Sequence, residues 1–354
     1  MSGTSLDGVD LAVCEFTESE KKWTYEILFA ETYPYSIGWK EKLSHAFTLS
    51  GNDVICLDRE YGQYLGELIN KKLASWNVKP ELVASHGHTV FHNPASRYTL
   101  QIGHGGVINS ITNIPVVCDF RSADVALGGQ GAPLVPVGDK ILFGEFDACL
   151  NLGGFANISF DFKGNRRAFD ICPVNIVLNE MVRIYDKEFD DQGGIGRQGK
   201  SDVALLKVLN GLPFYQYSFP KSLGREWVED YFTPIVKNST CSEYNKLATV
   251  YHHIAFQISE IVKKYPVKNI LVTGGGAKNT FLLELIRQYS EKELIVPQKE
   301  IVDFKEALVF AFLGLLNVLG EVNCYSSVTG ASRDSIAGAY YGAKNMKVGD
   351  SPLS

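Results

Sequence analysis

Apolar residues recur at two spacings along the chain, and these spacings predict alternating strands and helices. Residues 9–16 have the β-branched and aromatic content of a strand, and residues 23–30 are expected to pair with them across a charged turn at 18–22. In residues 53–76 the apolar positions follow helical spacing, which predicts a long amphipathic helix. Such alternation is typical of an α/β fold.

The same patterns predict the remaining elements. The apolar stretch 307–320 is too short to cross a bilayer and contains Asn317, so we expect a buried core helix there. Helices are expected at 36–49, 104–112, 175–185, 201–210, 246–264 and 304–319, and short strands at 82–85, 98–102, 116–118, 148–152, 157–160, 269–272 and 294–296.

Charge and cysteine usage narrow the class of protein. The net charge of −6 argues against a nucleic-acid partner. The 7 cysteines are scattered without a CxxC pair, which favours free thiols in a reducing compartment over a zinc site. The sequence shows no basic region followed by an apolar run, so we expect no signal peptide, no membrane partner and a cytoplasmic protein.

A glycine turn at the start of the sequence offers groups that bind phosphate. Glycines let backbone N–H groups point at phosphate oxygens, and the hydroxyls of the turn donate to the same oxygens. Asp7 would hold a water of a bound Mg²⁺, since this ion keeps several waters and few carboxylates. Alone, the motif is equally well a plain β-turn. Its residues are Gly3, Thr4, Ser5, Leu6, Asp7 and Gly8.

Two further glycine turns follow predicted strands. Gly153 and Gly154, with Asn157 beyond them, form a turn between two strands, for which a tight hairpin is the alternative. Gly274, Gly275 and Gly276 end an apolar strand and open a helix, a favourable position for a nucleotide. In this order, the three turns resemble the phosphate-1, phosphate-2 and adenosine segments of the actin/hexokinase/Hsp70 ATPase superfamily.

Six motifs extend the resemblance to one family. The chain reads MSGTSLDGVD at 1–10, SHGHTVFHNP at 85–94, DFRSAD at 119–124 with GGQGAPLVP at 128–136, NLGGFANIS at 151–159, TGGG at 273–276 and SVTGA at 327–331. They span nearly the whole chain, and the DFRSAD…GGQGAPLVP stretch is highly specific. The sequence resembles the anhydro-N-acetylmuramic acid kinase family.

The resemblance implies a fold and an activity. The fold would be α/β, a two-lobed actin-like ATPase (ribonuclease H-like) fold with the nucleotide in a cleft between lobes at 1–140 and 141–354. Family members use water to open the 1,6-anhydro bridge of 1,6-anhydro-N-acetylmuramic acid and use ATP with Mg²⁺ to phosphorylate the freed 6-oxygen. The product is N-acetylmuramic acid 6-phosphate in peptidoglycan recycling. The resemblance also implies a homodimer, although no interface pattern is legible in the sequence.

The resemblance assigns the general base to Asp170. The family pattern there is Phe-Asp-Thr-Gly-Pro-Gly-Asn, whereas this chain reads FDICPVN at 169–175. Without the family, a turn or helix-capping aspartate is the preferred interpretation. The change from Thr-Gly to Ile-Cys motivates a second hypothesis, a sugar- or nucleotide-binding protein of the same fold with impaired catalysis, because Ile and Val do not readily adopt glycine's positive φ.

Three more residues are candidates for substrate binding. Arg121 suits the substrate's lactyl carboxylate, and a structural ion pair to Asp119 or Asp124 is weighed evenly against that role. His86 is a candidate partner for sugar hydroxyls or a satisfied loop histidine. Glu306 is a site residue or a favourable acid in the first turn of a helix.

The first turn also leads to an expectation about the chain's start. A phosphate-1 turn joins two strands, and only the strand after it is present in this sequence. Family members carry a short apolar strand before the Met-Ser-Gly-Thr motif. We therefore expect that an added upstream strand raises stability and ATP affinity. A filament-forming actin relative has no support in the sequence.

Overall fold

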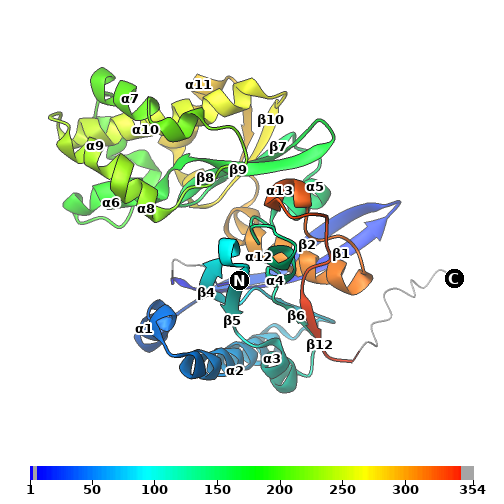
Figure 1. Ribbon diagram of the computed structural model, residues 1–354. Helices are drawn as coiled ribbons and strands as arrows, with labels where there is room; N and C mark the ends of the chain where they lie inside the picture. The colour runs from blue at the N-terminus through cyan, green and yellow to red at the C-terminus, as the bar shows by residue number, and fades with distance from the viewer. Residues whose placement is uncertain (3–5, 344–354) are drawn as a thin grey trace. The chain divides into compact units, whose positions relative to one another are not determined.

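The chain forms two compact α/β units, each with its own sheets (Figure 1). The computed structural model describes residues 1–2 and 6–343. Unit 1 comprises Met1–Leu142 together with the chain from Phe304, and unit 2 is Phe143–Asp303. The first boundary lies close to the predicted division at 140. The chain from Phe304 belongs to unit 1, whereas the sequence placed it in the second lobe.

Unit 1 contains a long hairpin, two small sheets and the helices that pack on them. Strand β1 pairs antiparallel with β2, β3 pairs parallel with β6, β6 pairs antiparallel with β12, and β4 pairs with β5. Its elements are β1 Gly8–Ser19, β2 Lys22–Pro34, α1 Ile37–Ser44, α2 Gly51–Trp76, β3 Val83–Ser85, β4 His88–Asn93, β5 Tyr98–Ile102, α3 Gly105–Thr112, β6 Val116–Cys118, α4 Ser122–Ala126, α5 Pro136–Leu142, α13 Ser326–Thr329, β12 Ala339–Tyr341 and most of α12 Lys299–Leu319.

Helix α2 shows how the apolar spacing becomes a packed face. Ser50 caps its first turn by accepting from the Asp53 N–H, and Asn77 ends it in the left-handed conformation. The buried side chains of Val54, Leu57 and Tyr61 face the core. They pack with the residues of β5, α3 and β6 in one apolar cluster. The predicted helix 53–76 is therefore confirmed.

The edge of β1 away from β2 borders an open cavity of about 690 Å³. Strand β3 and helix α12 also line this cavity. On this edge of β1, Val9 forms an isolated bridge with Ser2, and the Asp10 N–H donates to the Met1 carbonyl at 2.8 Å. The upstream strand expected from the sequence stays a prediction.

Unit 2 is built on one five-stranded sheet in the order β11-β10-β7-β8-β9. Helices α10 and α11 lie together over one face of the sheet (Figure 1). Its elements are β7 Ala148–Leu152, β8 Phe155–Phe162, β9 Asn165–Pro173, α6 Asn175–Val182, α7 Val203–Asn210, α8 Arg225–Trp227, α9 Thr233–Asn238, α10 Glu243–Lys264, β10 Asn269–Thr273, α11 Thr280–Ser290 and β11 Glu293–Ile295.

The strand directions in unit 2 identify its topology. Strands β7, β8 and β9 form an antiparallel meander, while β10 is parallel to both β7 and β11. The first strand therefore lies at the centre of the sheet, between the meander and the parallel pair. This arrangement is the ribonuclease H-like topology expected from the sequence.

Some strands differ from the sequence prediction. Strands β4, β9 and β12 were not predicted, and α12 begins at Lys299 rather than 304. The start of β9 is charged, so its sequence does not resemble a buried strand, although Arg166 is in fact buried there. Its guanidinium donates to the Ser159 hydroxyl on β8 at 2.9 Å.

A buried histidine makes the stability of unit 2 depend on pH. His253 is fully buried, and its ring atoms contact Asn210 Oδ1 at 2.6 Å and the Tyr215 hydroxyl at 2.8 Å. Burial lowers the pKa of His253 from 6.5 to about 3. Between these two pH values His253 binds a proton in the unfolded chain but not in the folded chain. The free energy of unfolding therefore falls as pH drops from about 6.5 to about 3.

We expect His253→Gln to lose part of this slope. Urea unfolding measured across that pH range provides the readout. His86 has a similarly lowered pKa, so a residual slope remains in the variant. An unchanged slope in His253→Gln would contradict the prediction.

Candidate active site

Two of the predicted glycine turns meet at one edge of the unit 2 sheet. Parallel strands β7 and β10 pair Asn151 with Thr273, so the turns that follow them leave the sheet side by side. Gly274 has φ +80°, and a Cβ there would lie 2.9 Å from the Leu152 carbonyl group. A Cβ at Gly276 would lie 2.7 Å from the Leu152 Cβ. The adenosine turn thus packs directly against the phosphate-2 turn.

Backbone hydrogen bonds from the start of α6 hold the phosphate-2 turn in place. The Asn175 and Val174 N–H groups donate to the carbonyls of Gly153 and Gly154 at 3.2 and 2.8 Å. The space a Cβ would occupy at Gly154 is nearly empty, with only Ile176 Cβ at 4.0 Å. Glycine therefore leaves the backbone open to a ligand at this point. Asn175 belongs to the quoted FDICPVN stretch, but no role was assigned to it from the sequence.

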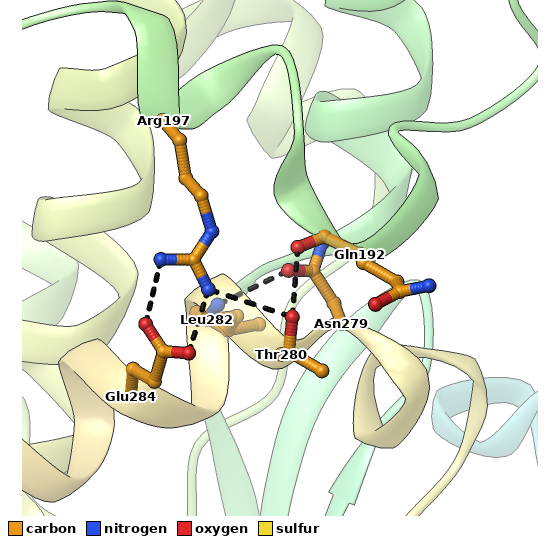
Figure 2. Close-up of polar contacts among 6 residues, drawn as sticks. All are labelled: Gln192, Arg197, Asn279, Thr280, Leu282 and Glu284. Atoms are coloured by element: carbon orange, nitrogen blue, oxygen red, sulfur yellow. Dashed lines mark hydrogen bonds and ion pairs between the residues drawn. The ribbon is translucent and has the colours of Figure 1, made fainter.

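The helix after the adenosine turn is anchored by the segment 191–198 (Figure 2). Asn279 caps α11 by accepting from the Leu282 N–H at 3.1 Å. The Thr280 hydroxyl donates to the Gln192 carbonyl at 3.1 Å, and Arg197 forms an ion pair with Glu284 at 2.6 Å. These bonds fix the N-terminal end of α11, where a helix attracts anionic groups.

Asp170 lies on β9, which pairs with the strand that follows the phosphate-2 turn, β8. The β8–β9 register places Asn157 opposite Asp170, next to a β-bulge. The Leu223 N–H donates to Asp170 Oδ2 at 2.9 Å. Burial raises the pKa of Asp170, while the Leu223 N–H and the charge of Lys221 lower it. Among residues 1–2 and 6–343, no hydrogen bond to Asp170 Oδ1 is recorded, so this oxygen is available to a ligand.

The altered residues after Asp170 do not adopt the left-handed conformation that favours glycine. Strand β9 continues through Pro173, and Val174 has φ −128°. In the part of the chain that the structure describes, the residues with positive φ do not include Ile171, Cys172 or Val174. These three positions therefore need no left-handed conformation, and Val174 adopts φ −128° and ψ −96°, outside the regular helix and strand regions.

In unit 1, His86 and Arg121 form one buried cluster. Arg121 Nε donates to His86 Nε2 at 3.0 Å, and His86 Nδ1 contacts the Gly87 carbonyl at 2.9 Å. Burial, reinforced by the Arg121 charge, lowers the pKa of His86 to about 3. His86 is thus neutral, and both ring nitrogens already have partners.

Arg121 forms neither of the ion pairs considered from the sequence, to Asp119 or to Asp124. Within the described residues, Asp119 bonds Ser122, and Asp124 accepts from the Gly131 N–H and from Thr329. Arg121 instead donates to the Gly131 carbonyl at 2.6 Å and is attracted to Glu306, which offsets the lowering of its pKa by burial.

Glu306 stands near this cluster on α12. Glu306 keeps access to solvent, but the surrounding protein removes part of the hydration of its carboxylate; this desolvation raises its pKa, and the Arg121 charge opposes that rise. The structure thus brings His86, Arg121 and Glu306 together from three separate segments. Their substrate roles stay predictions.

The phosphate-1 turn is described only in part. Gly3, Thr4 and Ser5 lie outside the described residues. Leu6 follows them, and Asp7 is exposed, with its carbonyl accepting from the Tyr35 N–H at 3.3 Å. A Cβ at Gly8 would overlap the Tyr33 carbonyl, so glycine is required where β1 and β2 begin to pair.

A Mg²⁺ ion held with a nucleotide fits Asp7. Such an ion takes one or two carboxylates and completes its shell with waters and phosphate oxygens. Asp7 offers an exposed carboxylate, which suits this mode of binding. The described residues hold no group of three or more His, Cys, Asp or Glu side chains placed to ligate a metal.

The sheet topology and the paired glycine turns define an ATPase-type α/β protein of the actin-like, ribonuclease H-like class. A profile of the family described as "Anhydro-N-acetylmuramic acid kinase" matches residues 1–343. The chain belongs to this family.

Curated relatives agree over nearly the full length. A protein named "Anhydro-N-acetylmuramic acid kinase" from Sulfurimonas denitrificans is 31% identical over 96% of this chain and 98% of its own. A protein of the same name from Shewanella putrefaciens is 33% identical over 97% of this chain and 98% of its own.

Solved structures resemble the chain more distantly. A ROK family glucokinase from Streptomyces griseus, in complex with glucose and AMPPNP, aligns at TM-score 0.39 and 12% identity over 86% of this chain and 99% of its own. An activator of 2-hydroxyisocaproyl-CoA dehydratase from Clostridium difficile, with bound ADPNP, aligns at TM-score 0.33 and 18% identity. The alignment covers 51% of this chain and 64% of the activator. Scores this low support no inference.

Proposed function

We propose that this enzyme uses ATP to convert 1,6-anhydro-N-acetylmuramic acid to N-acetylmuramic acid 6-phosphate and ADP, as a step of peptidoglycan recycling. Family membership over residues 1–343 supports the reaction. The observation that supports it best within the structure is the placement of Asp170 opposite Asn157 of β8, the strand that follows the phosphate-2 turn. The proposed proton acceptor and the proposed phosphate-binding turn thereby adjoin the same strand, β8.

Asp170 acts as the general base in this proposal. Its Oδ1 takes a proton from a water that attacks the anomeric carbon, and the bond from that carbon to the bridging oxygen breaks. The freed 6-oxygen attacks the γ-phosphoryl group of ATP, and ADP leaves. Leu223 keeps Oδ2 occupied, so the proton goes to one defined oxygen.

The glycine turns bind the nucleotide in this proposal. Gly153 and Gly154 would bind the phosphates, and residues 274–276 would bind the adenosine. Backbone N–H groups stabilise charge on the phosphates where water is excluded. Mg²⁺ held through Asp7 would neutralise part of that charge.

A coupled ADP-release assay tests the proposed reaction. We expect turnover with 1,6-anhydro-N-acetylmuramic acid and none with N-acetylmuramic acid or glucose. Turnover on the latter two alone would overturn the reaction class. No turnover on any sugar, with ATP still bound, would favour the second hypothesis, a binding protein of the same fold with impaired catalysis.

Arg121 is proposed to bind the lactyl carboxylate of the sugar. A planar guanidinium binds a carboxylate through two N–H groups, and an ammonium does not. We expect Arg121→Lys to raise KM for the sugar by about tenfold, equivalent to 1.4 kcal/mol, without changing KM for ATP. Arg59→Lys, at an exposed residue of the same unit, is the matched control. An unchanged sugar KM in Arg121→Lys would contradict the role.

Location and assembly stay predictions. No helix in the described part of the chain is long and apolar enough to span a membrane. The cysteines that the structure describes are free thiols, which supports a reducing compartment such as the cytoplasm. A homodimer is proposed from the family resemblance alone.

A further inference from the structure

A segment far from Asp170 in sequence runs along the strand that carries it. Strand β9 is the outer strand of the unit 2 sheet, so its free edge needs backbone partners. The Asp170 N–H donates to the Lys221 carbonyl at 3.2 Å. The Leu223 N–H donates back to Asp170 Oδ2 at 2.9 Å. The two bonds hold both the backbone and the carboxylate of Asp170.

Aromatic packing fixes this segment in place. Phe219 stacks on Phe169 of β9 with ring centroids 5.6 Å apart. The Lys221 ammonium lies 4.6 Å from the centroid of the Phe214 ring and donates to the Phe214 carbonyl at 3.4 Å. Phe214 is itself buried and packs against Trp227. The ammonium is also 6.0 Å from the centroid of the Phe169 ring, so it is held beside the residue that precedes Asp170 on β9.

The charges around Asp170 leave Lys221 as its main cation. Burial raises the pKa of Asp170, and the Leu223 N–H and then Lys221 oppose the rise. The other titratable groups that act on this pair are Cys172 on β9 and Lys264 on α10, and Tyr215 in the same loop interacts with Cys172. Burial raises the pKa values of Cys172 and Tyr215, so both stay neutral. Burial lowers the pKa of Lys221, and the positive charge of Lys264 adds to that lowering.

We propose that the segment 220–223 positions Asp170 for catalysis: the Leu223 N–H fixes one carboxylate oxygen, and Lys221 supplies the cation that keeps the carboxylate ionised. Lys221 is a positioning residue, because it acts through Asp170. This inference rests on the proposed function, in which Asp170 accepts a proton from water. A carboxylate that is buried without a cation would be protonated at mildly acidic pH and could not serve as a base.

The pH dependence of kcat/KM tests the role of Lys221. Removing the cation disfavours ionised Asp170, so the acid limb of the profile moves to higher pH. We expect Lys221→Met to lower kcat/KM about tenfold on the acid limb and to leave the alkaline plateau unchanged. Lys221 also lines an open groove of about 820 Å³, so solvent screening limits the effect.

Two further variants make the result decisive. Lys221→Arg keeps the positive charge and should restore the wild-type limb. Lys187→Met removes the same charge from an exposed position of unit 2 and should leave the profile unchanged. An acid limb in Lys221→Met that coincides with wild type, or an equal loss at every pH, would overturn the inference.

Carboxyl ¹³C NMR titration of Asp170 separates failure of this inference from failure of the proposed function. If Asp170→Asn stays active, the base assignment fails, and the NMR titration of wild type and Lys221→Met still shows whether Lys221 favours the ionised carboxylate. If Asp170→Asn is inactive but the titration is the same in both proteins, the positioning role of Lys221 alone is wrong.

Discussion

Asp170→Asn is expected to lower kcat/KM for the anhydrosugar by roughly 100- to 10,000-fold, the usual contribution of a general base. The amide keeps a carbonyl oxygen for the Leu223 N–H, so the local geometry is retained. It cannot take a proton from water at neutral pH. Single-turnover and steady-state rates on the anhydrosugar provide the measurement.

Two controls distinguish loss of the base from loss of structure. Asp161→Asn makes the same chemical change on the exposed side of β8 and should keep activity. Because burial raises the pKa of Asp170, its charge costs stability in the folded state above that pKa, and Asp170→Asn should not lower the melting temperature. Activity within about twofold of wild type in Asp170→Asn would rule out the proposed base.

Gly274→Ala is expected to weaken both the fold and the binding of ATP. Gly274 has φ +80° and ψ 171°, a region that essentially only glycine adopts, so alanine there costs about 1–3 kcal/mol. Its Cβ would also lie 2.6 Å from Asn151 Oδ1 and 2.9 Å from the Leu152 carbonyl, so the two glycine turns must separate. We expect a lower melting temperature and an ATP Kd at least about tenfold higher by calorimetry.

Gly164→Ala is the matched control for this variant. Gly164 has φ +79°, but nothing lies within 4 Å of the position of its Cβ. It should show the backbone cost of about 1 kcal/mol without any change in ATP affinity. If both variants bind ATP as wild type does, the packing of the turns at 153–154 and 274–276 is not required for the nucleotide.

The sequence predicted most regular elements because each leaves a local pattern. The apolar spacing of α2, the alternation in β1 and the strand before Gly274 are readable from neighbouring residues alone. The three glycine turns were found from their glycines and the predicted strands beside them, and the family pattern then indicated Asp170 as the candidate base. The order of strands in unit 2 agrees with the fold that the resemblance implied.

What the sequence did not predict depends on contacts between distant segments. Asp170 and Leu223 are separated by 53 positions, and no spacing rule links them. The side chain of Arg166 is charged yet buried because Ser159 and Asp161 accept from it across the hairpin. The grouping of His86 with Arg121 depends in the same way on a sheet that joins β3 to β6.

The position of an oxygen label tests the proposed reaction most directly. The substrate carries ¹⁸O in the 1,6-anhydro bridge, and the product is examined by the isotope shift of its ³¹P resonance. If water attacks the anomeric carbon and the freed 6-oxygen attacks ATP, the label lies between carbon 6 and phosphorus. A product whose phosphoester lacks the label would contradict this account, because the bridge would then have opened at carbon 6.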